Sequence, residues 1–186
     1  LRISTEHGLV SPKLLAQAMP LTAATKKTVL DARLECSRII HQKDDRLLVV
    51  VGPCSVHDMD AVREYGAKLV PLMKRFKQEL CIVMRVYFEK PRTNVGWKGF
   101  INDPDLDGSF NVNKGLEQAR RLLLNLTSMG IACGTEYLDV ICPQYLADLI
   151  SWGAIGARTV ESQVHRELAS GMPSPVGFKN NTDGNI

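Results

Sequence analysis

Five cationic side chains recur at or just after the ends of short apolar segments of this sequence. One acid and one thiol accompany them, and the set is Cys54, Arg85, Lys90, Arg92, Glu136, Arg158 and Lys179. So many like charges in one place would repel one another unless an anionic ligand neutralised them. Arginine makes bidentate contacts, and lysine point-charge contacts, to phosphate and carboxylate groups. The residue types therefore predict a site for a phosphorylated or carboxylated small molecule.

The thiol of Cys54 follows Gly52-Pro53 at the end of the first apolar run. A lone cysteine is more often a buried thiol than a ligand, but cationic neighbours favour the thiolate, which is the form that binds metal. His57 and His165 lie at no recognisable metal spacing from Cys54, so we interpret both as surface or packing histidines. Ser162 lies near His165, but the hydrolase elbow G-x-S-x-G is absent.

The elements that must position these side chains are short apolar runs alternating with amphipathic segments. We expect strands at Leu47–Val51, Leu80–Phe88, Ile131–Glu136, Ala154–Thr159 and Pro175–Lys179. The runs are rich in Val and Ile and lack strict alternation, which is typical of parallel strands buried on both faces. Helices are expected between them, at 60–76, 116–129, 143–150 and 160–169. This order predicts a parallel α/β sheet whose strands end at the site.

The first 45 residues differ in character from the rest. They contain two helical stretches, at Lys13–Met19 and Ala23–Ile40, and no Gly/Ser linker follows them. We therefore expect residues 1–45 to be an arm that packs on the main body, residues 46–186. A closed eight-stranded α/β barrel typically takes ~250 residues. Five strands are thus either an open sheet or the first part of a barrel.

The composition is that of an ordinary globular domain. The 186 residues carry 23 Lys and Arg against 20 Asp and Glu, a formal net charge of +3, and 45% are hydrophobic. Acidic residues interrupt the basic clusters, the apolar runs are far below the ~18 residues of a membrane helix, and no signal-peptide layout is present. The five cysteines form no C-x-x-C pair, and Cys36, Cys81 and Cys133 read as small buried hydrophobes. We expect a soluble, cytoplasmic protein that binds neither nucleic acid nor membranes.

Several long motifs closely resemble the type I 3-deoxy-D-arabino-heptulosonate 7-phosphate (DAHP) synthases. They are Gly52-Pro53-Cys54-Ser55-Val56-His57-Asp58, the run from Met84 to Thr93, Gly96-Trp97-Lys98-Gly99, the run from Trp152 to Thr159, the run from Glu161 to Glu167, and Val176-Gly177-Phe178-Lys179-Asn180. The resemblance covers essentially the whole chain from about residue 45, and the arm more weakly. An eight-carbon sugar-acid synthase shares the fold and the phosphoenolpyruvate chemistry, but Lys90-Pro91-Arg92-Thr93 favours the DAHP enzyme.

The resemblance implies a fold, a reaction and a cofactor. The fold is a (β/α)8 TIM-type barrel, of which about five of eight strands are present, with an N-terminal helical arm. The reaction condenses phosphoenolpyruvate with erythrose 4-phosphate to DAHP and phosphate, the first step of the shikimate pathway to aromatic amino acids. The cofactor is one divalent metal ion of the Mn, Fe, Co or Zn class.

The resemblance also implies roles for individual residues. Cys54 matches a metal ligand, and Lys90 is the candidate catalytic residue, protonating a developing oxyanion or orienting the aldehyde. The residues that match the phosphoenolpyruvate site are Arg85, Lys90, Arg158 and Lys179, with Glu136 and the Ala157 backbone nearby. The residues that match the site of the aldose phosphate are Pro91, Arg92 and Thr93.

The family's other three metal ligands, a His, a Glu and an Asp, lie on later strands than those in this sequence. Two alternatives therefore stay open beside the DAHP synthase: a 3-deoxy-D-manno-octulosonate 8-phosphate-type synthase and an inactive phosphate-binding fragment. Family habit predicts a homo-oligomer, a dimer or tetramer, whose arm reaches a neighbouring subunit or its own barrel. An aromatic amino acid effector is also expected, although Pro173 stands where the family commonly has Ser.

Overall fold

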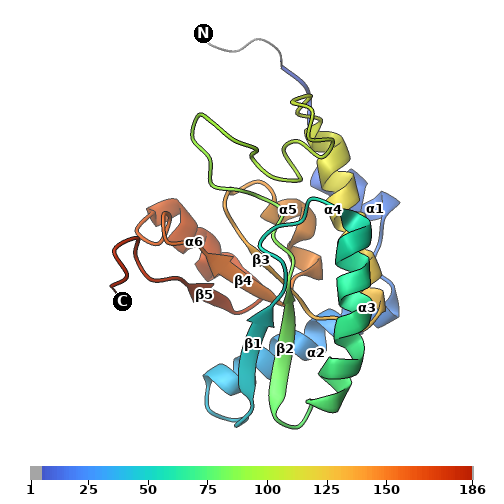
Figure 1. Ribbon diagram of the computed structural model, residues 1–186, viewed down its shortest axis with the longest axis vertical. Coiled ribbons are helices and arrows are strands. Elements are labelled where there is room, and N and C mark those ends of the chain that lie inside the picture. The colour runs from blue at the N-terminus through green and yellow to red at the C-terminus, as the bar shows by residue number, and fades with distance from the viewer. Residues whose placement is uncertain (1–5, 186) are drawn as a thin grey trace.

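The computed structural model describes residues 6–185 and contains five strands that alternate with helices (Figure 1). The elements are α1 (Pro12–Ala18), α2 (Ala23–Ile40), β1 (Leu47–Val51), α3 (Met59–Arg75), β2 (Leu80–Arg85), α4 (Val112–Ser128), β3 (Cys133–Glu136), α5 (Pro143–Leu146), the 3-10 turn η1 (Ala147–Leu149), β4 (Trp152–Ile155), α6 (Gln163–Gly171) and β5 (Val176–Phe178). No helix within this range is long and apolar enough to cross a membrane.

The five strands form one parallel sheet in the order β1-β2-β3-β4-β5. Each strand is therefore paired with the strand that precedes it in the chain, and the sheet curls as half of a barrel (Figure 1). Parallel strands that follow one another in this way bring all their carboxyl ends to one edge. The predicted α/β fold class is confirmed.

Helix α4 shows how the core is built from the sequence. The Asn111 side chain accepts a hydrogen bond from the Lys114 amide and caps the first turn. An apolar stripe then faces the sheet and is fully buried, consisting of Leu116, Leu122, Leu123 and Leu126. Each such leucine contributes about 1.5–3 kcal/mol by leaving water. Gly130, at a φ of 82°, follows the helix and turns the chain toward β3.

Two arginines fasten the N-terminal arm to the body of the same chain. Arg120 of α4 is 1% exposed, pairs with Asp148 at 2.8 Å and donates from Nε to the Met19 carbonyl at 3.0 Å. Arg33 of α2 donates to the Ile150 carbonyl at 2.9 Å. A buried charge needs such partners, because an unpaired one costs several kcal/mol. The arm is thus joined to the body by charge-assisted hydrogen bonds as well as by apolar packing.

The predicted cysteine environments are confirmed, and several element boundaries are corrected. Cys36, Cys81 and Cys133 are all buried. The fourth strand ends at Ile155 because the chain turns at once, with the Thr159 amide bonding to the Gly156 carbonyl. The last helix accordingly begins at Gln163 rather than at residue 160. The helix expected at 143–150 is one turn of α5 followed by η1, so its last residues wind more tightly.

Candidate active site

A cavity of about 260 Å³ lies at the carboxyl ends of the strands, and all five predicted cations line it. These cations are Arg85, Lys90, Arg92, Arg158 and Lys179. Cys54, Pro91, Glu136 and Ala157 also line this cavity, whereas Thr93 is not among its lining residues. Its lining residues lie at, or shortly after, the ends of all five strands, which is why residues 125 positions apart in the sequence meet here. The cavity is strongly cationic and suits a small anion.

The Cys54 thiol is the exposed cysteine of this chain and lies beside Lys90. Its Sγ is 3.1 Å from the Lys90 Nζ, and this hydrogen bond with the ammonium charge lowers the pKa of Cys54. Gly52 lets the turn before Cys54 lie against the end of β2, because a Cβ there would lie 2.7 Å from the Arg85 carbonyl oxygen. A thiolate held at a strand end is a suitable ligand for a divalent transition metal.

Arg85 ends β2 and is fixed by the turn that contains Cys54. Its Nη2 donates to the Cys54 carbonyl at 3.0 Å. Its Nε is buried and has no hydrogen-bond partner among the described residues. An unpaired guanidinium N–H in a buried position costs free energy that an anionic ligand would recover.

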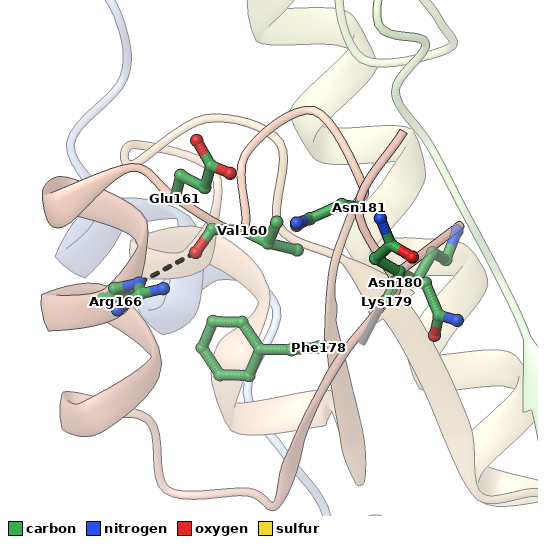
Figure 2. Close-up of a pocket in the computed structure, with 8 residues that line it drawn as sticks. Val160, Glu161, Arg166, Phe178, Lys179, Asn180 and Asn181 are labelled. Atoms are coloured by element: carbon green, nitrogen blue, oxygen red, sulfur yellow. Dashed lines mark hydrogen bonds between the residues drawn. The ribbon is translucent and has the colours of Figure 1, made fainter. Parts of the chain in front are cut away.

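Glu136 and Lys179 close the other side of the cavity. The Lys179 Nζ lies 3.5 Å from the Glu136 Oε2, and the Glu136 side chain is 15% exposed. Gly156 leaves room for that carboxylate, since a Cβ would fall 2.1 Å from its Oε1. Figure 2 shows Lys179 and Phe178 on opposite sides of the chain, as expected for successive residues at the end of a strand.

A larger cavity of about 530 Å³ lies beside the first and shares Lys179 with it (Figure 2). It lies between α6 and the segment after β5, and its other cation, Arg166, donates to the Val160 carbonyl at 2.8 Å. Its remaining polar side chains are one acid, Glu161, and three asparagines, and the apolar Phe178 also lines it. The concentration of charge therefore distinguishes the smaller cavity as the candidate site.

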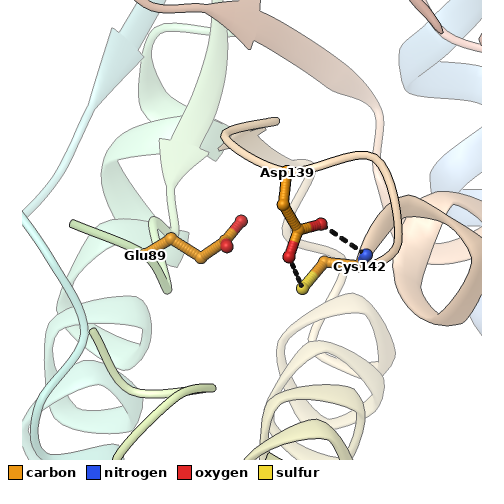
Figure 3. Close-up of side chains that lie close together, drawn as sticks. All are labelled: Glu89, Asp139 and Cys142. Atoms are coloured by element: carbon orange, nitrogen blue, oxygen red, sulfur yellow. Dashed lines mark hydrogen bonds between the residues drawn. The ribbon is translucent and has the colours of Figure 1, made fainter. Parts of the chain in front are cut away.

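Glu89, Asp139 and Cys142 form a compact cluster beside the candidate site (Figure 3). One ligand atom from each lies within 4.8 Å of the others. Burial, followed by the Asp139 charge, raises the pKa of Glu89 to about 8, and burial raises that of Cys142. The Cys142 Sγ donates to the Asp139 Oδ2 at 3.1 Å. Two of the three groups thus hold protons at neutral pH, and a cation would have to displace both.

Cys54 differs from this cluster, because it has no such neighbouring ligand groups among the described residues. Within residues 6–185, no group of three metal-ligating side chains includes Cys54. Its favoured thiolate nevertheless matches the form in which sulfur binds metal, so Cys54 suits the role of one ligand among several. His57 is exposed. His165 lies 2.8 Å from both the Ser162 hydroxyl and the Leu138 carbonyl, which confirms that it is a packing histidine.

Two residues that line the cavity, Tyr87 and Glu89, were not predicted to be functional. They follow Arg85 at alternate positions, and the intervening Val86 and Phe88 are buried on the other side. An extended chain points alternate side chains the same way. The spacing Arg85, Tyr87, Glu89 was therefore a signal that could have identified both residues.

The comparisons with known proteins agree with this geometry. A model of the DAHP synthetase I family matches residues 19–186. The Phe-sensitive phospho-2-dehydro-3-deoxyheptonate aldolase of Escherichia coli is 58% identical over 186 residues, which are 100% of this chain and 53% of that protein. A Trp-sensitive aldolase of the same name from Salmonella typhimurium is 55% identical over 185 residues, again covering 53% of that protein.

A solved structure extends the comparison to three dimensions. The phospho-2-dehydro-3-deoxyheptonate aldolase of Francisella tularensis superposes with a TM-score of 0.95 at 60% identity. The match covers 97% of this chain and 53% of that one. The chain therefore spans about half the length of the relatives it matches.

Proposed function

Since the chain belongs to the DAHP synthetase I family, we propose that it carries the anion-binding half of an enzyme that condenses phosphoenolpyruvate with erythrose 4-phosphate. One water molecule is consumed as well, because it supplies an oxygen to the carbon from which the phosphate leaves. The products would be DAHP and phosphate, at the first step of the shikimate pathway. The names of the relatives favour this seven-carbon product over the eight-carbon alternative. The observation that carries the proposal is the convergence of five cations on one cavity of about 260 Å³.

The predicted site residues are assigned to two proposed subsites, one for each substrate. Arg85, Arg158 and Lys179 are proposed to hold the phosphate and carboxylate of phosphoenolpyruvate, with the unpaired Arg85 Nε as one donor. Pro91, Arg92 and Thr93 belong to the loop after β2 and are proposed to receive the aldose phosphate. Two anions approach each other in a cleft only when fixed cations neutralise them.

Lys90 is proposed as the catalytic residue. The methylene carbon of phosphoenolpyruvate attacks the aldehyde carbon, and the aldehyde oxygen gains negative charge as the carbon–carbon bond forms. An ammonium group at the boundary of the two subsites can donate a proton or a hydrogen bond to that oxygen. Cys54 is proposed to supply one ligand to a divalent ion of the Mn, Fe, Co or Zn class, which when bound would polarise the carbonyl. Lys90 lies 3.1 Å from that thiol.

Partners of the whole protein are proposed from its relatives and its surface. Relatives are named Phe-sensitive or Trp-sensitive, so we propose regulation by an aromatic amino acid. We also propose a homo-oligomer, because five large apolar side chains in the described part of the arm face solvent. They are Leu9, Leu14, Leu30, Leu34 and Ile40, which are 46% to 61% exposed.

Binding of phosphoenolpyruvate tests the proposal without requiring turnover. Isothermal titration of the chain should give binding that weakens as salt increases, and Arg158→Met should abolish most of it. Lys27→Met is the matched control, because that lysine side chain is 76% exposed on α2. A condensation assay with manganese then tests the reaction. Binding that is absent, or equal in Arg158→Met and the control, would contradict the proposed site.

A further inference from the structure

We propose that Tyr87 is a positioning residue whose ring holds Arg85 and Lys179 in place for the anion, an inference that rests on the proposed function. Tyr87 follows β2, lines the cavity and is only 6% exposed. The Arg85 guanidinium carbon lies 3.8 Å from the centre of its ring. The Lys179 Nζ lies 5.4 Å from the same centre. One aromatic ring therefore contacts two cations that come from different strands.

The ring shared by Arg85 and Lys179 reduces the repulsion between their positive charges. Arg85 ends β2 and Lys179 follows β5, and two cations held in one small cavity repel each other before any ligand arrives. The face of an aromatic ring carries negative potential and attracts a cation placed within about 6 Å of its centre. Tyr87 meets this condition for both side chains. It therefore offsets part of their repulsion without adding a negative charge that would compete with the ligand.

Tyr87 is itself held rigidly. Its carbonyl accepts a hydrogen bond from the Val56 amide at 2.8 Å, and its neighbours Val86 and Phe88 are 0% and 1% exposed. Burial raises the pKa of the Tyr87 phenol, so the ring stays uncharged at neutral pH. A buried, uncharged ring on this anchored backbone restricts the positions that its two cations can take. Binding then costs less conformational entropy than it would with two free side chains.

The other contacts of the two cations complete the arrangement. For Arg85, the Cys54 carbonyl accepts from Nη2 at 3.0 Å, and ring and carbonyl together set the plane of the guanidinium. The buried Nε is then left without a protein partner and can serve a ligand. The Lys179 Nζ pairs with the Glu136 Oε2 at 3.5 Å, which is longer than the roughly 2.7–2.9 Å of a strong charge-assisted hydrogen bond. Both cations thus depend on Tyr87 for part of their orientation.

The test compares Tyr87→Phe, which keeps the ring, with Tyr87→Leu, which keeps an apolar side chain without it. We expect phosphoenolpyruvate to bind the Phe variant as it binds the parent chain, and the Leu variant roughly tenfold more weakly. Tyr65→Leu is the matched control, since Tyr65 is 38% exposed on α3. Equal binding by the Phe and Leu variants would overturn the inference.

A second measurement separates positioning from loss of stability. The NMR signals of the Arg85 side chain should show an upfield ring-current shift in the parent and in Tyr87→Phe, and lose it in Tyr87→Leu. Thermal unfolding of each variant shows whether the fold is intact, and the signals are read below that transition. Arg85 signals that do not change in Tyr87→Leu would overturn the inference. If the parent shows the shift but does not bind phosphoenolpyruvate, the proposed function fails while the ring contact stands.

Discussion

Replacing Glu89 by glutamine should remove a pH dependence of stability that the cluster of Glu89, Asp139 and Cys142 creates. The carboxyl of Glu89 is largely buried and faces Asp139, and its pKa is raised to about 8 from an ordinary value of 4.5. Below pH 4.5 the Glu89 carboxyl is protonated in both the folded and the unfolded chain, so it does not lower the free energy of unfolding. Between pH 4.5 and 8 only the unfolded chain loses the proton. Stability therefore falls as pH rises through this window.

The size of the effect follows from the width of that window. Each pH unit costs about 1.36 kcal/mol, so the loss reaches about 3 kcal/mol at pH 7 and about 5 kcal/mol above pH 8. These figures are upper values, because the Glu89 side chain keeps some contact with solvent. Glutamine cannot ionise, and its amide can donate to Asp139 as the protonated acid does. We expect Glu89→Gln to match the parent at pH 4.5 and to be more stable at pH 8.

Urea unfolding followed by circular dichroism, from pH 4.5 to 9, measures the difference. Glu79→Gln is the control, because that glutamate is exposed beyond α3 and should leave the pH profile of the parent unchanged. Asp139→Asn should reduce the same slope without abolishing it, since burial is the larger cause of the raised Glu89 pKa and the Asp139 charge the second. Parallel profiles for Glu89→Gln and the parent between pH 5 and 8 would refute the reasoning.

Two further substitutions test the electrostatics elsewhere. Lys90→Met should raise the pKa of Cys54 and slow its alkylation by iodoacetamide at pH 7 severalfold, which mass spectrometry can follow because Cys54 is the exposed cysteine. An unchanged rate would contradict the Lys90 contact. Arg120→Met should lower the free energy of unfolding by about 3 kcal/mol, because it leaves Asp148 and two carbonyls without their donor. Arg121→Met, on the exposed side of the same helix, should change it by less than about 0.5 kcal/mol.

Local patterns were sufficient to predict most of the fold. The helix at Ala23–Ile40 and the strand at Leu47–Val51 were predicted with the bounds that the structure has. Both depend on signals within the segment itself, namely apolar residues at helical spacing in the helix and a run of five apolar residues in the strand. The strand at Trp152–Ile155 was displaced, because two glycines and a tight turn weaken its apolar pattern.

The candidate site was predicted to the extent that it follows strand ends. Position after a strand is enough to bring Arg85, Arg158 and Lys179 to one edge of a parallel sheet. Contacts between loops carry no such local signal. Glu89 meets Asp139 across fifty residues of sequence because the loops after β2 and β3 approach each other. The burial of Arg120 was equally unpredictable from the sequence, since a basic residue on an amphipathic helix usually points to solvent.

The sequential order of the strands has a consequence for how the protein is made. From β2 onward, each strand can pair with a strand that was synthesised before it, so the sheet can grow in the direction of synthesis. Pairing between successive strands also keeps sequence separations shorter than a non-sequential strand order would. The anion cavity, by contrast, needs Lys179 at the end of β5. Its cations are therefore brought together only after β5 has joined the sheet. An anionic ligand can bind the folded site, but it cannot assist the early steps of folding.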